Sequence, residues 1–427
     1  MKRSIFALVT ALLLWGPGAA QLNKNHELVA IKGATIIPVV GEDIPEGVIL
    51  IQNGRILDIG AGVDIPQNAR VIDAQGLFAY PGMIDSYCSL GLSEIGSVRA
   101  TQDSRETGKL NPQVSSVEAL RPDSMHIPIS RSNGIALALV APSGGLISGK
   151  SGLIRLVGWT PQEMIVKSPL FMHIQLPGGR GRTQQDTTKA APPQASKKIK
   201  EIKDLFHRAR YYQKRNTAAM KDARLTLPAF DEKLEFILPV VHRELPVMIA
   251  VDTASGILDA IKFIKEEQIQ AVFYGAGEGW KVAEEINKAG IPVVLGSLYA
   301  MPSKWEDGYD AIYRNPAVLN QAGVKIAFSS SDAALAKDLP YHAAKAAAFG
   351  LDRREALKAV TIYPAEIFGV SDMYGSLEKG KAANIVLADG DILELRTTIT
   401  LSFIDGKETD LSSIYTELLE KFRKRIE

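Results

Sequence analysis

The chain has 427 residues, 46% of them hydrophobic, which is enough to form a large buried core and excludes disordered and fibrous proteins. Its 49 lysine and arginine residues nearly balance its 48 aspartate and glutamate residues, leaving a net charge of +1. Such a chain has no strong overall field to attract a polyanion, so we expect no nucleic-acid partner. Cys88 is the only cysteine, which rules out an intrachain disulfide.

Residues 1–20 have the pattern of a secretory signal peptide. Lys2 and Arg3 precede an apolar run over residues 5–15, and small residues follow up to Ala20. The run is well short of the roughly 20 apolar residues that a membrane-spanning helix needs. We therefore expect cleavage after Ala20, a mature chain without a transmembrane segment, and a periplasmic or secreted location.

The two ends of the mature chain share a β-rich pattern. Residues 27–79 consist of short β-branched runs broken by turns, and a similar pattern returns after residue 373. Asn53-Gly54 between two apolar runs predicts a tight hairpin, because both turn residues need positive φ. Isolated hairpins are only marginally stable. We therefore predict that residues 21–80 and 373–427 pair into one small composite β-sandwich.

Between the ends, apolar runs alternate with helical stretches over residues 81–372, which is typical of parallel βα units. Helices are predicted at 257–266 and 278–289, the second ending at Gly290. Segment 143–159 also fits a loop or hairpin laid over the barrel mouth. Eight strands suit an α/β fold of the (β/α)₈ TIM-barrel type, and they are predicted at 82–87, 135–141, 153–156, 171–175, 246–250, 271–275, 292–296 and 325–329.

Residues 178–224 interrupt this alternation with a basic insertion of thirteen basic and four acidic residues. It begins rich in glycine and proline and continues as a predicted helix. Ordinary solvation of the outer helix face explains the charge, and a patch for an acidic partner or lipid headgroups is the alternative. One face of this helix is apolar, formed by Ile199, Ile202, Leu205, Phe206 and Ala209.

Several segments together resemble the amidohydrolase superfamily, in particular a secreted branch related to imidazolonepropionases and prolidases. They are IQNGRILDIG and VIDAQGLFAYPGMID near the start, PVMIAVDTASGILDAI and VFYGAGEGWKVAEEINKAGIPVVLG in the middle, and AVTIYPAEIFGV, GSLEKGKAANIVLADGD and FIDGK near the end. The resemblance implies a metallo-dependent hydrolase barrel. It also implies hydrolysis of non-peptide or cyclic C–N bonds by a metal-activated water at the barrel mouth.

The metal ligands that the resemblance implies are largely missing. A His-x-His pair on strand one is replaced by Tyr87 and Ser89, and the histidines of strands five and six are replaced by Ala250 and Gly275. Only Asp332 matches the aspartate of strand eight, whereas catalytic zinc normally has three protein ligands. We therefore expect no metal cofactor, and we predict that histidines restored together at Tyr87, Ser89, Ala250 and Gly275 recruit zinc.

The remaining candidate site residues follow from their predicted places near the mouth. Asp332 is the candidate general base or substrate anchor, unless it is simply hydrogen-bonded to Ser329 and Ser331. Cys88 is predicted to face the helix layer and to pack as a small apolar side chain. His26, His207 and His242 are interpreted as surface histidines. The candidate ligand-binding residues are Tyr87, Ser89, Gly144, Gly145, His126 and His173.

These observations favour a catalytically degenerate amidohydrolase-like protein, either silent or retaining small-molecule binding at the barrel mouth. Two alternatives stay open. One is an active hydrolase that uses Asp332 with a repurposed histidine. The other is a non-catalytic subunit that partners an active amidohydrolase or forms a homo-oligomer.

Overall fold

The computed structural model describes residues 27–176, 193–300 and 305–425. The predicted signal peptide, His26 and residues 178–192 of the insertion lie outside them. In chain order the strands are β1 (Val29–Ile36), β2 (Ile44–Gln52), β3 (Arg55–Gly60), β4 (Arg70–Asp73), β5 (Phe78–Pro81), β6 (Met83–Cys88), β7 (Ile135–Val140), β8 (Ile147–Arg155), β9 (Ile165–Gln175), β10 (Val247–Val251), β11 (Ala271–Gly275), β12 (Val293–Leu295), β13 (Ile326–Phe328), β14 (Ile385–Ala388), β15 (Ile399–Ile404) and β16 (Lys407–Glu408).

The α-helices lie mostly in the central part of the chain. They are α1 (His126–Arg131), α2 (Pro161–Met164), α3 (Pro193–Lys221), α4 (Glu232–Val241), α5 (Ala254–Glu267), α6 (Ala283–Ala289), α7 (Ala311–Gln321), α8 (Leu339–Ala348), α9 (Arg353–Lys358), α10 (Ile362–Ile367) and α11 (Ile414–Arg423). Two eight-stranded sheets organise these elements.

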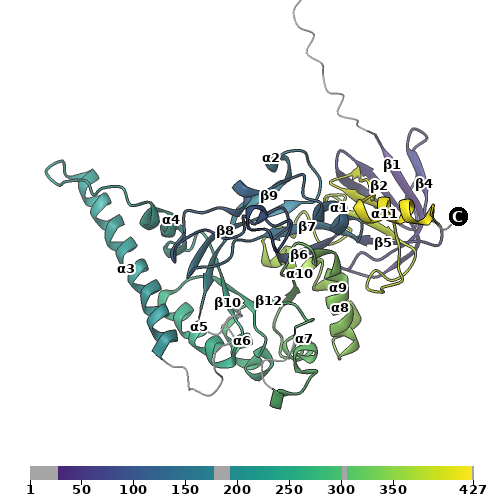
Figure 1. Ribbon diagram of the computed structural model, residues 1–427. Helices are drawn as coiled ribbons and strands as arrows, with labels where there is room; N and C mark the ends of the chain where they lie inside the picture. The colour runs from purple at the N-terminus through teal and green to yellow at the C-terminus, as the bar shows by residue number, and fades with distance from the viewer. Residues whose placement is uncertain (1–26, 177–192, 301–304, 426–427) are drawn as a thin grey trace, which may run out of the picture.

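The first sheet, called the terminal sheet below, contains β1–β5 and β14–β16, and it lies at one side of the molecule (Figure 1). Its order is β16-β15-β14-β5-β1-β2-β3, with β4 paired to β1. The two chain ends meet where β5 and β14 pair antiparallel, with Ala79 opposite Leu387. Strands from both ends therefore pair in one sheet, as the sequence predicts.

Side-chain alternation divides the terminal sheet into two apolar faces. Ile31 and Ile49 of the first strands pack in one core with Ile385 and Phe403 from the far end of the chain, whereas Ala30 and Leu50 pack on the opposite face. The predicted hairpin is present between β2 and β3, with φ of 53° at Asn53 and 80° at Gly54. The larger core is therefore shared between residues more than 300 positions apart in the sequence.

The second sheet, called the barrel sheet below, runs in the order β6 to β13. All eight predicted barrel strands correspond to strands of this sheet. Neighbours from β9 to β13 are parallel, and so are β6 and β7. Helices α5, α6, α7 and α8 follow β10, β11, β12 and β13, which is the expected βα alternation.

The direction of β8 departs from the predicted (β/α)₈ arrangement. β8 is antiparallel to both β7 and β9, so β7, β8 and β9 form a meander inside an otherwise parallel sheet. Only residues 141–146 connect β7 to β8, and a parallel crossover needs about a dozen or more residues. The central fold is thus a mixed α/β barrel-like sheet, and segment 143–159 supplies one of its strands.

The sheet is nearly closed where β13 approaches β6. The Ser331 backbone N–H donates to the Tyr87 carbonyl at 3.0 Å at the upper end of this seam. Lower down, the carbonyls of Ala359 and Val360 accept from the Phe328 and Ile84 N–H groups, so this segment bridges the two edges. Closure brings the ends of β6 and β13 to one rim.

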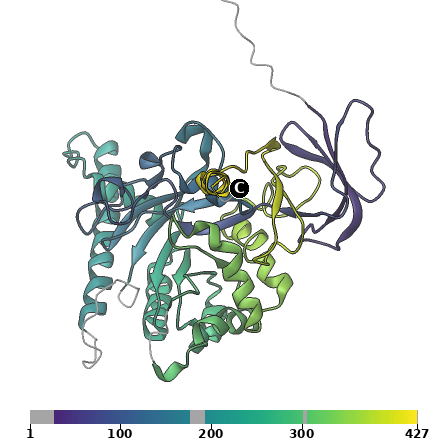
Figure 2. The same cartoon turned by 45° about the vertical axis from the view of Figure 1, so that its right-hand side comes forward.

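Helices cover the parallel part of the barrel sheet, as Figures 1 and 2 show. α5 begins at the Thr253 N-cap, and α6 ends at Gly290 with φ of 66°, as the sequence predicts. α3 packs through its apolar face, with Phe206 against Phe263 of α5 at 6.0 Å between ring centroids. In the described part of the chain, no helix has the length and apolar character needed to cross a membrane.

Candidate functional site

A cavity of about 550 Å³ opens at the barrel mouth. The parallel strands β10–β13 all end at this rim, so the loops that follow them converge there. Most side chains around the cavity are small or polar, and three are charged. The charged ones are Arg105, Asp252 and Asp332.

Two stacked tyrosines line the cavity from β6 and β11. The rings of Tyr87 and Tyr274 lie 3.8 Å apart between centroids with an interplanar angle of 15°. Burial raises the pKa of both phenols above the ordinary value, and the Tyr274 hydroxyl also hydrogen-bonds the Ser331 side chain. Both tyrosines are therefore neutral donors and acceptors near pH 7.

The strand register shows which residue of β11 enters the mouth. Tyr274 pairs with Ala250 of β10, both line the cavity, and the Tyr274 ring meets inward-facing Tyr87. Gly275, the position predicted from the sequence, contributes only backbone to the wall. Its φ is +95°, and a Cβ atom there would lie 2.5 Å from Asp252 Oδ1. The structure therefore places the Tyr274 side chain, one residue before Gly275, in the cavity wall.

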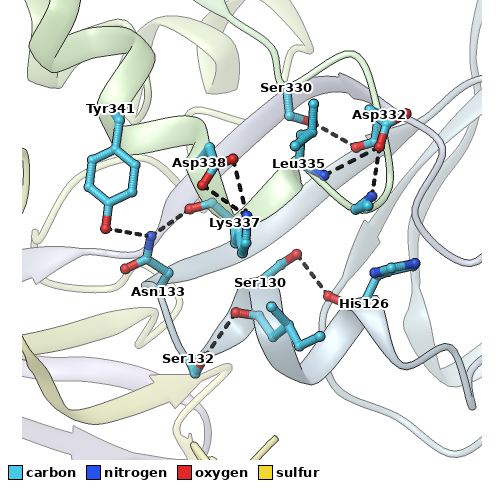
Figure 3. A network of polar contacts seen from close by, with 12 residues as sticks. His126, Ser130, Ser132, Asn133, Ser330, Asp332, Leu335, Lys337, Asp338 and Tyr341 are labelled. Carbon is cyan, nitrogen blue, oxygen red and sulfur yellow. Dashed lines mark hydrogen bonds and ion pairs between the residues drawn. The ribbon is translucent and has the colours of Figure 1, made fainter. Parts of the chain in front are cut away.

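The structure brings some of the predicted site residues together and leaves others apart. Three predicted site residues are not among the residues that line the cavity: Gly145, His126 and His173. His126 begins α1, where its carbonyl accepts from the Ser130 hydroxyl (Figure 3), and its Nε2 lies 2.9 Å from the Glu94 carbonyl. Those that line the cavity are Tyr87, Ser89, Gly144, Ala250, Gly275 and Asp332.

Asp332 lies on an exposed turn of the rim. Its Oδ1 accepts hydrogen bonds from the backbone N–H groups of Ala334 at 2.8 Å and Leu335 at 3.3 Å (Figure 3). Ser329 and Ser331 instead bond each other, so these serines are not its partners. The carboxylate is thus held by backbone, while its residue still faces the cavity.

A second carboxyl group, Asp85, is completely buried at the seam of the barrel. Its Oδ1 accepts from the Tyr87 and Ser330 backbone N–H groups at 3.2 and 3.1 Å, and its Oδ2 lies against the Ser330 hydroxyl. Burial raises the pKa of Asp85 to about 7, although these hydrogen bonds lower it. Asp85 therefore joins β6 to β13 beneath the cavity.

His173 lies on β9, two residues before cavity-lining Gln175, and is only 4% exposed. Its ring contacts the edge of Tyr87 at 5.6 Å between centroids, and its Nε2 has no hydrogen-bond partner among the described residues. Burial lowers the pKa of His173 to about 3. The imidazole is thus neutral and sits below the cavity floor.

A buried neutral histidine should weaken the fold in acid. Below about pH 6.5 the unfolded chain binds a proton at His173, whereas the folded chain does not until about pH 3. We expect wild type to lose about 3 kcal/mol relative to His173→Phe between pH 7 and pH 4, measured by urea unfolding. The change in packing caused by His173→Phe affects the free energy of unfolding equally at both pH values. A stability difference between the two proteins that does not vary with pH would therefore contradict a neutral, buried imidazole.

Cys88 is buried in the wall of β6 and contacts the Leu139 carbonyl at 3.6 Å. Burial and the nearby Asp85 raise the pKa of its thiol well above the usual value. The thiolate form needed for a nucleophile is therefore disfavoured, in agreement with a packing role.

Sequence reasoning missed Arg105, Gln175 and Asp252, which also line the cavity. Asp252 directly follows β10 at the mouth end, and an acidic residue at such a position is a usable signal. Arg105 comes from the long segment between β6 and β7, whose path no periodic pattern predicts.

Comparison with known proteins finds a family that resembles this chain in sequence and in fold. The model of the Amidohydrolase family matches residues 282–410. The crystal structure of an amidohydrolase from Thermotoga maritima MSB8 superimposes with a TM-score of 0.80 at 25% identity, covering 90% of this chain and 99% of that chain. These similarities place the fold within the amidohydrolase superfamily.

Two further proteins are less similar to this chain than the T. maritima amidohydrolase. Amidohydrolase tasK from Hapsidospora irregularis is 22% identical over 386 residues, which are 84% of this chain but only 39% of that protein. A prolidase crystallised with N-methylphosphonate-L-proline shares the fold, with a TM-score of 0.55 and 16% identity over 90% of this chain and 99% of that chain. The chain therefore spans well under two thirds of its curated relative from H. irregularis.

The mouth residues of this chain do not suit the metal that the resemblance implies. Among the described residues, no three His, Cys, Asp or Glu side chains come close enough together to hold an ion. The positions that the resemblance matches to metal ligands carry Tyr87, Ser89, Ala250 and Gly275, and the Tyr274 side chain lies in the cavity wall beside the last of them. Phenol and hydroxyl groups that stay protonated near pH 7 are poor zinc ligands.

Proposed function

We propose that this protein is a catalytically degenerate member of the amidohydrolase superfamily that binds a small polar molecule at the barrel mouth without a metal ion. The observation that supports this most directly is the Tyr87–Tyr274 stack, because two large rings lie where the family's ligands would converge. A cavity of about 550 Å³ still remains above them. That volume falls within the range of small-molecule sites.

The lining favours a polar ligand that makes many hydrogen bonds. Serine, glutamine and asparagine side chains surround the cavity, and Arg105, Asp252 and Asp332 offer charges of both signs. A hydrolase that pairs Asp332 with a histidine is the competing proposal. None of the described histidines is among the cavity-lining residues, and His173 lies beneath Tyr87, which weighs against that proposal.

Metal analysis of the purified protein is the decisive experiment. We expect far less than one zinc or manganese per chain, no chelator-sensitive hydrolysis of cyclic amides or dipeptides, and stabilisation by a polar ligand in a thermal-shift screen. About one metal per chain together with chelator-sensitive turnover would refute the proposal. Turnover without any metal would instead favour the hydrolase based on Asp332.

The structure also revises how a metal site could be rebuilt. Histidine at Gly275 would need a left-handed backbone and would place its Cβ against Asp252, so a quadruple variant with Gly275→His is expected to fold poorly. The set Tyr87→His, Ser89→His, Ala250→His and Tyr274→His is expected to bind zinc, because those side chains face the mouth. Zinc titration of the two quadruple variants tests this difference. Equal zinc binding by both sets would show that Tyr274 is not the inward position.

A further inference from the structure

The far end of α3 projects away from the body of the molecule. Residues 213–230, called the α3 arm below, comprise the last turns of this helix and the segment leading toward α4 (Figures 1 and 2). No residue from 213 to 233 is buried, whereas the earlier turns of α3 pack through Ile202, Phe206 and Ala209. The arm therefore contributes nothing to the barrel core.

Large apolar side chains are nevertheless concentrated on the arm. Met220 is 79% exposed and Phe230 is 71% exposed. Leu225 and Leu227, which lie between them in the sequence, are 50% and 58% exposed. Single exposed apolar residues are ordinary on a protein surface. Four within eleven residues, on a segment without a buried residue, indicate a surface that meets something apolar.

The arm is also positively charged. It carries four basic residues and one acidic residue, Asp222, giving a local charge of +3 in a chain whose total is +1. Arg224 pairs with Asp222, while Lys214, Arg215 and Lys221 extend along the helix. Two copies of the arm would repel each other, so the charge disfavours self-association through it and favours an anionic partner.

We propose that the α3 arm docks this protein on the surface of an anionic phospholipid membrane. Its apolar side chains would enter the boundary between headgroups and acyl chains while the lysine and arginine side chains bind phosphate groups. The arm projects from the body of the molecule, so its exposed side chains can reach a flat lipid surface. Each basic residue near such a surface strengthens binding by about fivefold.

Vesicle co-sedimentation of the full chain tests this. We expect binding to vesicles that contain phosphatidylglycerol at least about tenfold stronger than binding to pure phosphatidylcholine vesicles, and weaker at high salt. Lys214→Glu with Lys221→Glu is expected to reduce binding by more than tenfold, and Met220→Ser with Phe230→Ser by a similar factor. These positions are exposed, so the variants should fold normally.

Matched controls on the other side of the molecule separate the arm from overall charge and hydrophobicity. Arg396→Glu with Lys407→Glu makes the same change in net charge, and Leu395→Ser removes an apolar side chain that is 74% exposed. Neither should weaken vesicle binding. The proposal would be overturned if the arm variants bound vesicles as strongly as wild type, or if the control variants weakened vesicle binding as much as the arm variants did. If the Met220/Phe230 variant bound polyglutamate as strongly as wild type did, and also bound vesicles as strongly as wild type did, the arm would be assigned to an acidic protein instead.

Discussion

Ending the chain after Asp372 is expected to abolish cooperative folding of the terminal sheet. β14 pairs β5 on one side and β15 on the other, so the truncation removes the strand that joins the two chain ends. It also removes Leu377, Ile385, Leu387 and Phe403 from the core that they share with the first strands. The remaining apolar face and the exposed β5 edge should promote aggregation. Circular dichroism melting and size-exclusion chromatography measure both effects.

A shorter truncation provides the matched control. Ending the chain after Ser412 removes α11, in which no residue is buried, and every strand stays in place. The free energy of unfolding should then change by less than about 0.5 kcal/mol. If the chain ending at Asp372 stayed soluble and unfolded cooperatively, the pairing of the two ends would not be needed for stability.

Asp85→Asn is expected to stabilise the protein above neutral pH. The folded pKa of Asp85, about 7, lies above the value near 4 of an unfolded aspartate, so the unfolded chain ionises first as pH rises. The stability that this residue contributes is therefore present below about pH 4 and is lost as pH rises to about 7, by about 4 kcal/mol. Asparagine carries no such ionisation.

Asparagine can also keep the local hydrogen bonds. Its oxygen can accept from the Tyr87 and Ser330 N–H groups, and its amide can donate to the Ser330 hydroxyl, which then donates to the Asp332 carbonyl at 3.0 Å. We expect Asp85→Asn to be about 1–3 kcal/mol more stable than wild type at pH 8 and close to wild type at pH 4, as measured by urea unfolding.

Asp85→Ala separates the charge from the hydrogen bonds. It removes the ionisation but leaves two buried N–H groups without their acceptor, so it should be less stable than Asp85→Asn at every pH. Destabilisation by Asp85→Asn that grows with pH would mean that the carboxylate is ionised in the folded state and that its charge strengthens the seam.

Local sequence patterns determined the strands, the turn and much of the mouth. Asn53-Gly54 specifies its hairpin because the two residues tolerate positive φ, and Gly290 ends α6 for the same reason. The resemblance to the amidohydrolase superfamily placed Tyr87, Ser89 and Ala250 at the cavity, and strand alternation explains why residues 87 and 89 face the same side. The pairing of the chain ends followed because neither β-rich end can bury its apolar face alone.

Tertiary structure alone decided the remaining features. An apolar run does not encode its direction, so the antiparallel β8 became visible only through its partners β7 and β9. The local backbone at Gly275 turns away from regular strand geometry, and only the register with Ala250 identifies Tyr274 as the inward residue. Asp85 meets Ser330 across 245 positions of sequence, because barrel closure and not local spacing brings β6 beside β13.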